Sequence, residues 1–218
     1  MTTSVYHPDL SQVSSEYIGA DDLKVAASII YNAYFDDPLF TDIFQADREG
    51  YEARLRSAIR EEVNIFWESG QPLIGLYEEG RLLAVSCLIA PDASFGAGRF
   101  WHWRLKMLLT TGYSGTKQMI AKEEKVREKI PAKNYYMLSL IAVHPDHQDM
   151  GLGHRLMGAM LGLLEEDKQA EGIGVLVTLP KCLTFFNAAK FQHVEDIGVG
   201  TITGKVMFRP RDPEQSNP

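Results

Sequence analysis

The chain has 218 residues, of which 45% are hydrophobic and 23% charged, the proportions of an ordinary globular protein. This length allows one α/β domain with a substantial core, or at most two small domains. The formal net charge of −7 argues against a general nucleic-acid-binding protein, which usually carries a basic stripe, and at most favours a cationic substrate.

The two cysteines, Cys87 and Cys182, each lie in an apolar segment, so we expect no disulfide framework and a reducing compartment. The opening MTTSVYHPDL lacks the basic start and apolar run of a signal peptide. No stretch approaches the roughly 18 apolar residues that span a bilayer. We therefore expect a cytoplasmic protein with no membrane partner.

The first half of the chain predicts two helices followed by a β-hairpin. Apolar residues recur at helical spacing from Asp21, and this helix is expected to end near Pro38. A second helix is predicted over residues 48–68. Two apolar runs, 72–77 and 82–90, are separated by a short glycine-bearing turn and predict paired strands.

The second half predicts alternating strands and helices, which requires at least part of the sheet to be parallel. After a loop (91–98) and an aromatic-rich helical insert (99–129), we expect a strand buried on both faces (137–143), a helix (153–171), a second buried strand (175–179), a short helix (183–190) and two strands near Val194 and Val206. We interpret residues 1–218 as a single domain with a core of about 21–209 and a disordered polar tail at 210–218.

The segment from Gln148 to Gly153 lies between a predicted strand and a predicted helix. It therefore places backbone N–H groups without intrahelical partners at a helix N-terminus, where the helix dipole adds partial positive charge. Gly151 and Gly153 leave no Cβ between the main chain and a bound anion. The predicted ligand is a phosphate or pyrophosphate, and Arg155 could add a cationic contact.

Other interpretations of this segment are weaker. A dinucleotide site would have a third glycine where Leu156 stands, and a P-loop would end in Gly-Lys-Ser/Thr. The glycines could merely start a helix. A metal site at His144 and His147 lacks a second cluster of ligands, so we expect no metal.

The run Leu140–Gly153, with Val143-His144-Pro145 followed by Gln148-x-x-Gly151-x-Gly153, closely resembles the acetyl-CoA-binding signature of the GNAT superfamily of N-acyltransferases. The order of elements over about 21–209 is similar to that fold, which implies a mixed α/β architecture with a centrally splayed β-sheet flanked by helices. The phrase YYMLSLIAVHPDHQ, the aromatic insert and the ending FQHVEDIGVGTITGKVMFRP look most like the puromycin-N-acetyltransferase-like subgroup.

The resemblance implies that acetyl-CoA lies where two central parallel strands separate. Main-chain groups on one strand would bind its pantetheine arm, the following turn would hold its pyrophosphate, and two residues after the second strand would also contact pantetheine. An N–H near Ala142 or Val143 would polarise the thioester carbonyl. The implied cofactor-binding residues are Ile141, Ala142, Val143, Gln148, Asp149, Met150, Gly151, Leu152, Gly153, His154, Arg155, Thr178 and Asn187.

Proton transfer is less clearly assigned. Family members often use the tyrosine of a Tyr-x-x-x-Gly-Phe phrase to protonate the departing thiolate, but here Phe186 and Lys190 replace the tyrosine and the glycine. The thiolate could also leave with water as proton donor. Ser139 could position a water, and His102 or His193 could relay a proton near neutrality.

The aromatic insert around Phe100, Trp101 and Trp103 is either an amphipathic helix on the core or the lining of an acceptor pocket. The expected function is transfer of an acetyl group from acetyl-CoA to the amine of a small molecule, in a ternary complex. A protein or peptide N-acetyltransferase and a non-catalytic CoA-binding module stay open as alternatives. Both a monomer and a homodimer fit the sequence.

Overall fold

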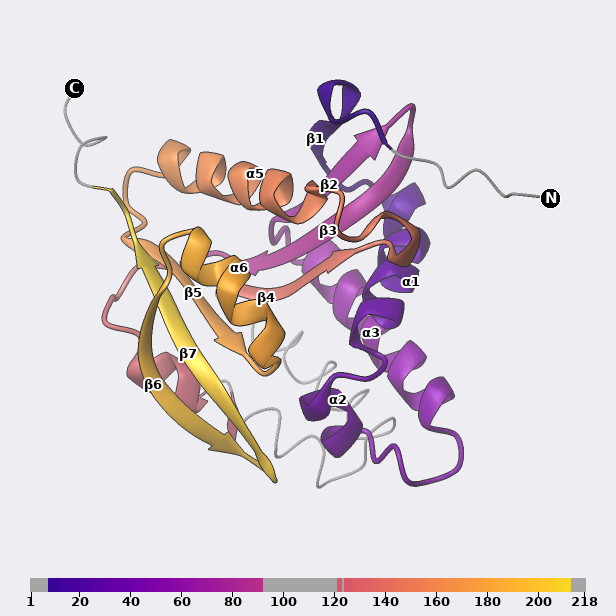
Figure 1. Ribbon diagram of the computed structural model, residues 1–218, viewed down its shortest axis with the longest axis vertical. Helices are drawn as coiled ribbons and strands as arrows, with labels where there is room; N and C mark the ends of the chain where they lie inside the picture. The colour runs from indigo at the N-terminus through magenta and orange to yellow at the C-terminus, as the bar shows by residue number, and fades with distance from the viewer. Residues whose placement is uncertain (1–7, 92–120, 123, 213–218) are drawn as a thin grey trace.

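The computed structural model describes residues 8–91, 121–122 and 124–212. One seven-stranded sheet organises the fold, with the strand order β1-β2-β3-β4-β5-β7-β6 (Figure 1). The strands are β1 (Ser14–Tyr17), β2 (Leu73–Glu78), β3 (Arg81–Ile89), β4 (Tyr136–Val143), β5 (Gly172–Val177), β6 (Gln192–Val199) and β7 (Ile202–Pro210). The helices are α1 (Leu23–Tyr34), α2 (Pro38–Ile43), α3 (Tyr51–Glu68), α5 (Leu152–Glu166) and α6 (Leu183–Ala188).

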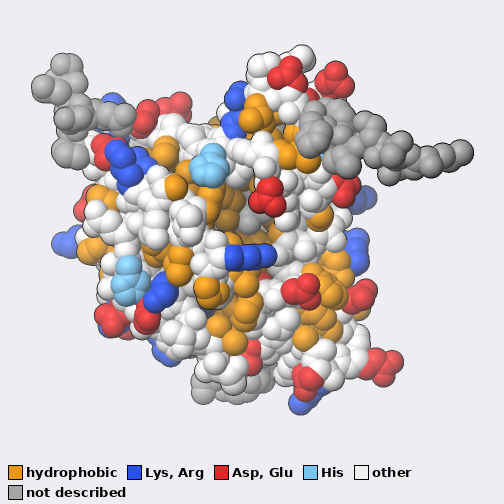
Figure 2. Space-filling view, viewed as in Figure 1, with side chains coloured by type: hydrophobic (Ala, Val, Ile, Leu, Met, Phe, Trp, Pro, Cys, Tyr) orange, Lys and Arg blue, Asp and Glu red, His pale blue; other side chains and the backbone are white. Residues whose placement is uncertain are grey.

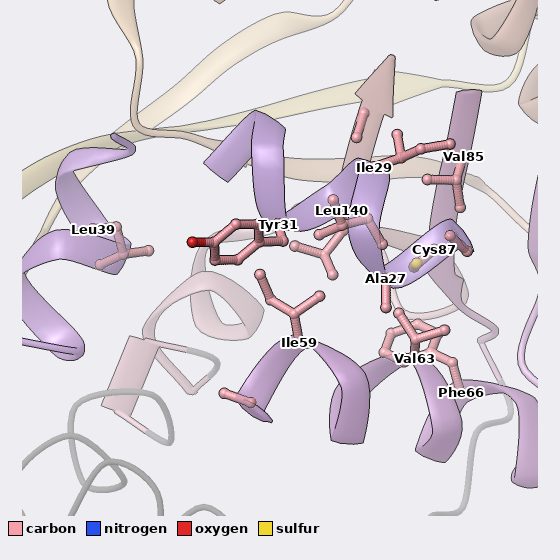
Figure 3. Packing of buried hydrophobic residues seen from close by; sticks show 14 of the residues in the cluster. Ala27, Ile29, Tyr31, Leu39, Ile59, Val63, Phe66, Val85, Cys87 and Leu140 are labelled. Carbon is pink, nitrogen blue, oxygen red and sulfur yellow. The ribbon is translucent and has the colours of Figure 1, made fainter. Parts of the chain in front are cut away.

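Helices cover both faces of the sheet. On one face, apolar side chains of α1 and α3 meet the inward side chains of β3 and β4; Ala27, Ile59, Val63, Cys87 and Leu140 lie together in this cluster (Figure 3). On the other face, α5 and α6 contribute Leu156, Met160 and Phe186, which pack against β4 and β5. Figure 2 shows the molecule from the same side as Figure 1, with apolar side chains visible in the middle between polar ones. The mixed α/β class and the helix-flanked sheet are confirmed.

Among the described strands, the sheet separates at its single parallel pair. β4 and β5 are in register over Tyr136–Leu138 and Ile173–Val175, whereas the last four residues of β4 pair with β3 alone. A β-bulge accompanies the separation, because Leu88 faces Leu138 and Cys87 faces Leu140, which leaves Ser139 as the extra residue. The two strands diverge beyond this point (Figure 1). The predicted central splay is therefore present.

The hairpin predicted around Gly80 is confirmed: Glu79 and Gly80 both have positive φ, +49° and +75°. This is the combination that a two-residue turn between twisted strands requires. The antiparallel register of β2 and β3 runs from Leu73–Cys87 to Glu78–Arg81.

Several elements differ from the sequence-based predictions. β1 and α2 are not predicted; the long helix α5 ends at Glu166, five residues early, and β5 begins at Gly172 rather than 175. β4 alternates between buried and half-buried residues instead of being buried on both faces. The start of the predicted tail is anchored, since the Arg211 amide donates to the Glu171 carbonyl (2.8 Å). The loop 92–98, most of the aromatic insert and the last six residues of the tail lie outside the described residues.

Candidate active site

The end of β4 presents main-chain groups on its open edge. His144 donates its amide to the Leu83 carbonyl at 2.8 Å, so the amide two residues earlier, at Ala142, is also directed toward β3. The amides of Ile141 and Val143 alternate with these two and face the opposite edge of β4, where the pairing with β5 has stopped. Of the two amides considered for polarising a thioester, that of Ala142 is thus engaged in the sheet and that of Val143 is on the open edge, together with the amide of Ile141.

The turn after β4 ends at the N-terminus of α5. Gly151 is the N-cap with φ +83°, a conformation that L side chains rarely adopt, and Asp149 also has a left-handed φ of +60°. Gln148 donates its side-chain amide to the Val143 carbonyl at 3.3 Å, which folds the turn back onto β4. The turn therefore places the first amides of α5 next to the end of β4. Backbone amides at a helix N-terminus are the groups that an anion site requires.

Two predicted cofactor contacts around this turn have other partners. Arg155 donates from Nε and Nη2 to the Val13 carbonyl at 3.1 and 2.6 Å, so its guanidinium fixes the segment before β1. The His154 ring meets the Phe185 ring edge to face at 5.3 Å. A Cβ on Gly153 would lie 3.4 Å from the Phe185 ring, an ordinary van der Waals distance, so the packing against α6 does not itself require a glycine here. Met150 is half-buried beside them.

Tyr34, at the end of α1, contacts the open edge of β4. Its hydroxyl accepts the Ile141 amide at 3.1 Å. Burial raises the pKa of this phenol well above its usual value, and the nearby Asp37 carboxylate raises it further. Tyr34 therefore stays protonated over the physiological range. Sequence analysis missed this residue, because the partners are 107 positions apart.

Asp37 connects the corner between α1 and α2 to the end of β5. The carboxylate is only 2% exposed. Its Oδ1 accepts the Leu39 and Phe40 amides at 2.9 and 3.2 Å and so caps α2, while its Oδ2 accepts the Thr178 hydroxyl at 2.7 Å. Tyr34 and Asp37 together place this corner across the opening, with one contact to β4 and one to the residue after β5.

Aromatic side chains run from Tyr34 toward the bulge in β4. The ring of Phe40 lies 4.9 Å from that of Tyr34 and 5.8 Å from that of Phe44. Phe40 and Phe44 line a small pocket with the bulge residue Ser139. Its remaining lining residues are Ala58, Ile59, Glu62, Lys122 and Leu140. Ser139 is therefore on the α1–α3 side of the opening, next to a mostly apolar lining that also carries one carboxylate and one lysine.

The usual position of the family's tyrosine holds a core side chain. Phe186 is 4% exposed and contacts the rings of Phe185 and Phe191. Tyr136 is also engaged, since its hydroxyl donates to Asp167 at 3.0 Å at the beginning of β4. The Cys182 thiol is half-buried, and burial raises its pKa. Asn187 is exposed on α6.

The two histidines considered for proton relay are not brought to this opening. His193 is on the edge strand β6, where its Nε2 contacts Asp196 Oδ1 at 2.6 Å. It aligns with Met207, Val175 and Leu138 in successive strands, so three strand spacings of about 4.8 Å separate it from β4. His102 lies outside the described residues.

Within the described ranges, no group of three His, Cys, Asp or Glu side chains is arranged to hold a metal ion. The same ranges contain no helix long and apolar enough to cross a membrane.

Comparison with solved structures identifies this arrangement as an acetyltransferase fold. A histone acetyltransferase HPA2-related protein from Corynebacterium glutamicum aligns over 91% of this chain and 96% of its own, with a TM-score of 0.67 and 14% identity. A putative arylalkylamine N-acetyltransferase from the yellow fever mosquito Aedes aegypti gives a TM-score of 0.62 at 12% identity, covering 92% and 88% of the two chains. An agmatine N-acetyltransferase mutant gives 0.61 at 12% identity, covering 91% and 99%.

The sequence itself places the protein more firmly. Residues 38–183 match the model of the acetyltransferase (GNAT) family, and the chain belongs to this family. It is accordingly an enzyme of the acyl-CoA-dependent N-acyltransferase class. No curated protein matches the chain by sequence.

Proposed function

We propose that this enzyme transfers an acetyl group from acetyl-CoA to the primary amine of a small molecule with an apolar or aromatic body. The observation that carries the proposal is the end of β4–β5 pairing at Leu138, which leaves main-chain groups of β4 open beside the α5 N-terminus. These groups fit the two chemically distinct parts of the co-substrate, its amide-containing arm and its pyrophosphate.

On the cofactor side, Ile141 and Val143 would hydrogen-bond the pantetheine amides, and the turn from Gln148 to Gly153 would surround the pyrophosphate. Arg155 would contribute to pyrophosphate binding through its positive charge and not through a hydrogen bond, because its donors are directed at the Val13 carbonyl. Thr178 would border the arm from the β5 side. Asn187 is exposed on the adjoining helix and could reach the same arm.

On the acceptor side, Phe40 and Phe44 line a small pocket beside Ser139, and this apolar lining favours a molecule with an apolar body. Glu62 and Lys122 add one charge of each sign to this lining, so the acceptor preference rests on the apolar side chains. The Aedes aegypti neighbour is described as a putative arylalkylamine N-acetyltransferase and another neighbour as an agmatine N-acetyltransferase, so amines of either kind suit the fold. The pocket of this chain favours the arylalkyl kind.

In the proposed reaction the amine attacks the thioester carbonyl directly within a ternary complex. The Ile141 or Val143 amide would stabilise the developing oxyanion, and one such donor is typically worth about 3 kcal/mol. The binding surface orients the nucleophile, which is itself a large contribution to the rate. The sequence resemblance to the puromycin-N-acetyltransferase-like subgroup would agree with a small aromatic acceptor.

The test is CoA release, followed by a thiol reagent, with acetyl-CoA and a panel of amines. The panel contains arylalkylamines, puromycin, agmatine, alkylamines and a lysine-bearing peptide. We expect arylalkylamines to give the highest kcat/KM. Preference for the peptide would favour a protein N-acetyltransferase, and acetyl-CoA binding without turnover of any amine would favour a non-catalytic CoA-binding module.

A further inference from the structure

We infer that Tyr34 is a catalytic residue that hands a proton to the departing sulfur of CoA, a role that Phe186 cannot fill; this inference rests on the proposed acetyl transfer. Phe186 has no exchangeable proton and is packed among Phe185 and Phe191 in the core. Tyr34 approaches the same opening from the opposite face of the sheet, on α1 instead of α6.

The position of the Tyr34 hydroxyl follows from its one contact with β4. It lies 3.1 Å from the Ile141 nitrogen, on the open edge of the strand. A thioester whose carbonyl oxygen takes this amide would move the hydroxyl aside by roughly the width of an oxygen atom. The sulfur and the oxygen are bonded to the same carbon, so the displaced hydroxyl remains beside the scissile C–S bond.

The proton of Tyr34 is available. In the contact with Ile141 the hydroxyl oxygen is the acceptor, and among the described residues no acceptor is found for its hydrogen. Burial and the neighbouring Asp37 carboxylate both disfavour the tyrosinate. These surroundings suit a hydroxyl that gives its proton to the sulfur and takes a proton from the amine nitrogen in the same step.

The reaction then balances without any additional group. The neutral amine attacks the carbonyl carbon and forms the C–N bond, and the carbonyl oxygen becomes an oxyanion held by main-chain N–H groups. The intermediate collapses as the C–S bond breaks with its electron pair moving to sulfur. Tyr34 passes its hydroxyl proton to that sulfur and receives the proton that the nitrogen loses, which leaves an amide, CoA thiol and an unchanged tyrosine.

The neighbours of Tyr34 are arranged for this task. Phe40 stacks obliquely on its ring at 4.9 Å and limits the motion of the ring. The bond between Asp37 and Thr178 fixes the corner that follows Tyr34 to the end of β5. Tyr34 is therefore on a helix whose end is tied to both sides of the opening.

The decisive variant is Tyr34→Phe, which removes one oxygen and keeps the ring. With the best amine of the panel we expect kcat to fall by about 100-fold, the range of acid–base contributions. The Kd of acetyl-CoA, measured by calorimetry, should change by less than about 3-fold. Tyr51→Phe is the matched control: its hydroxyl bonds the Phe35 carbonyl in the same cluster, and its kcat should equal that of the wild type.

A second readout needs no amine. In the binary complex with CoA, a hydroxyl directed at sulfur stabilises the thiolate and lowers the pKa of the bound thiol. Titration followed by thiolate absorbance should therefore give a higher thiol pKa in Tyr34→Phe than in the wild type or Tyr51→Phe. This holds whatever the acceptor is.

Together the readouts separate the two proposals. If the wild type acetylates no amine but the thiol pKa still depends on Tyr34, the proposed function is wrong and the contact with sulfur stands. If the wild type is active and Tyr34→Phe keeps its kcat, or its thiol titration coincides with the wild type, the role of Tyr34 is refuted. An equal loss of acetyl-CoA affinity and turnover would also refute it, because the hydroxyl would then serve binding alone.

Discussion

Removing the Thr178 hydroxyl by Thr178→Val should destabilise the protein, because the carboxylate of the nearly buried Asp37 loses the donor to its Oδ2. Hydrogen bonds to charged groups contribute about 1.5–3 kcal/mol, so we expect a loss of about 2 kcal/mol. Asp37→Ala removes the same bond and also the cap of α2, which is typically worth about 1 kcal/mol, for a total near 3 kcal/mol. Asp37→Asn retains the capping oxygen and can donate to Thr178, so its loss should be about 1 kcal/mol.

The measurement is urea unfolding followed by circular dichroism. With an m-value of about 2 kcal/mol/M, Asp37→Ala should lower the midpoint by about 1.5 M. In the double variant Asp37→Ala/Thr178→Val we expect no more destabilisation than in Asp37→Ala alone, since the single changes remove the same bond. Additive losses, or an Asn variant as unstable as the Ala variant, would refute the assignment of this bond.

Two further predictions concern the turn between β4 and α5. Gly151→Asp should weaken acetyl-CoA binding at least 10-fold in calorimetry. The control is Gly70→Asp, which is also at a positive φ (+65°) but in open space and should bind acetyl-CoA normally. Equal affinity in both variants would contradict an anion site at Gly151. Burial, with a smaller effect of His144, lowers the pKa of His147, so below about pH 6.5 the unfolded chain binds a proton that the folded chain does not, and stability should fall as pH falls. The difference in urea midpoint between pH 7.5 and pH 5.5 should shrink in His147→Asn, and an unchanged difference in this variant would contradict the prediction.

The sequence predicts the central strand–turn–helix unit well because its signals are local. An apolar run, a glycine-bearing turn and a helical repeat follow one another within 137–166, and each predicts its own element. The splay itself came from the resemblance that these residues carry, since the pattern of β4 alone would equally suit a strand paired on both sides.

The missed elements lack such signals. β1 is four exposed residues with no apolar alternation. Pro38 predicts the end of a helix, although proline is equally suited to the first turn of the next one, and Asp37 caps that helix as Asp residues commonly do. A six-residue helix between two longer ones gives little periodicity to detect.

The functional contacts that were missed are the non-local ones. Tyr34 reads as the last apolar residue of an amphipathic helix, and only its contact with Ile141 shows its relation to the site. The sequence suggests pyrophosphate as the partner of Arg155, but it gives no sign of the hydrogen bond to the Val13 carbonyl, which lies 142 positions away. Residue type and spacing identify a turn that can bind an anion, but they do not show which long side chains already have partners.

The short parallel pairing between β4 and β5 also affects how the whole sheet behaves. β1–β4 and β5–β7 are each continuous antiparallel sheets, and only three residue pairs connect them. The sheet thus consists of two antiparallel parts joined by one short pairing. The corner at Asp37 connects across this junction through its hydrogen bond to Thr178. A molecule that lies between β4 and β5 with amide groups of its own acts on this sheet as an added strand would. Substrate binding therefore also stiffens the protein.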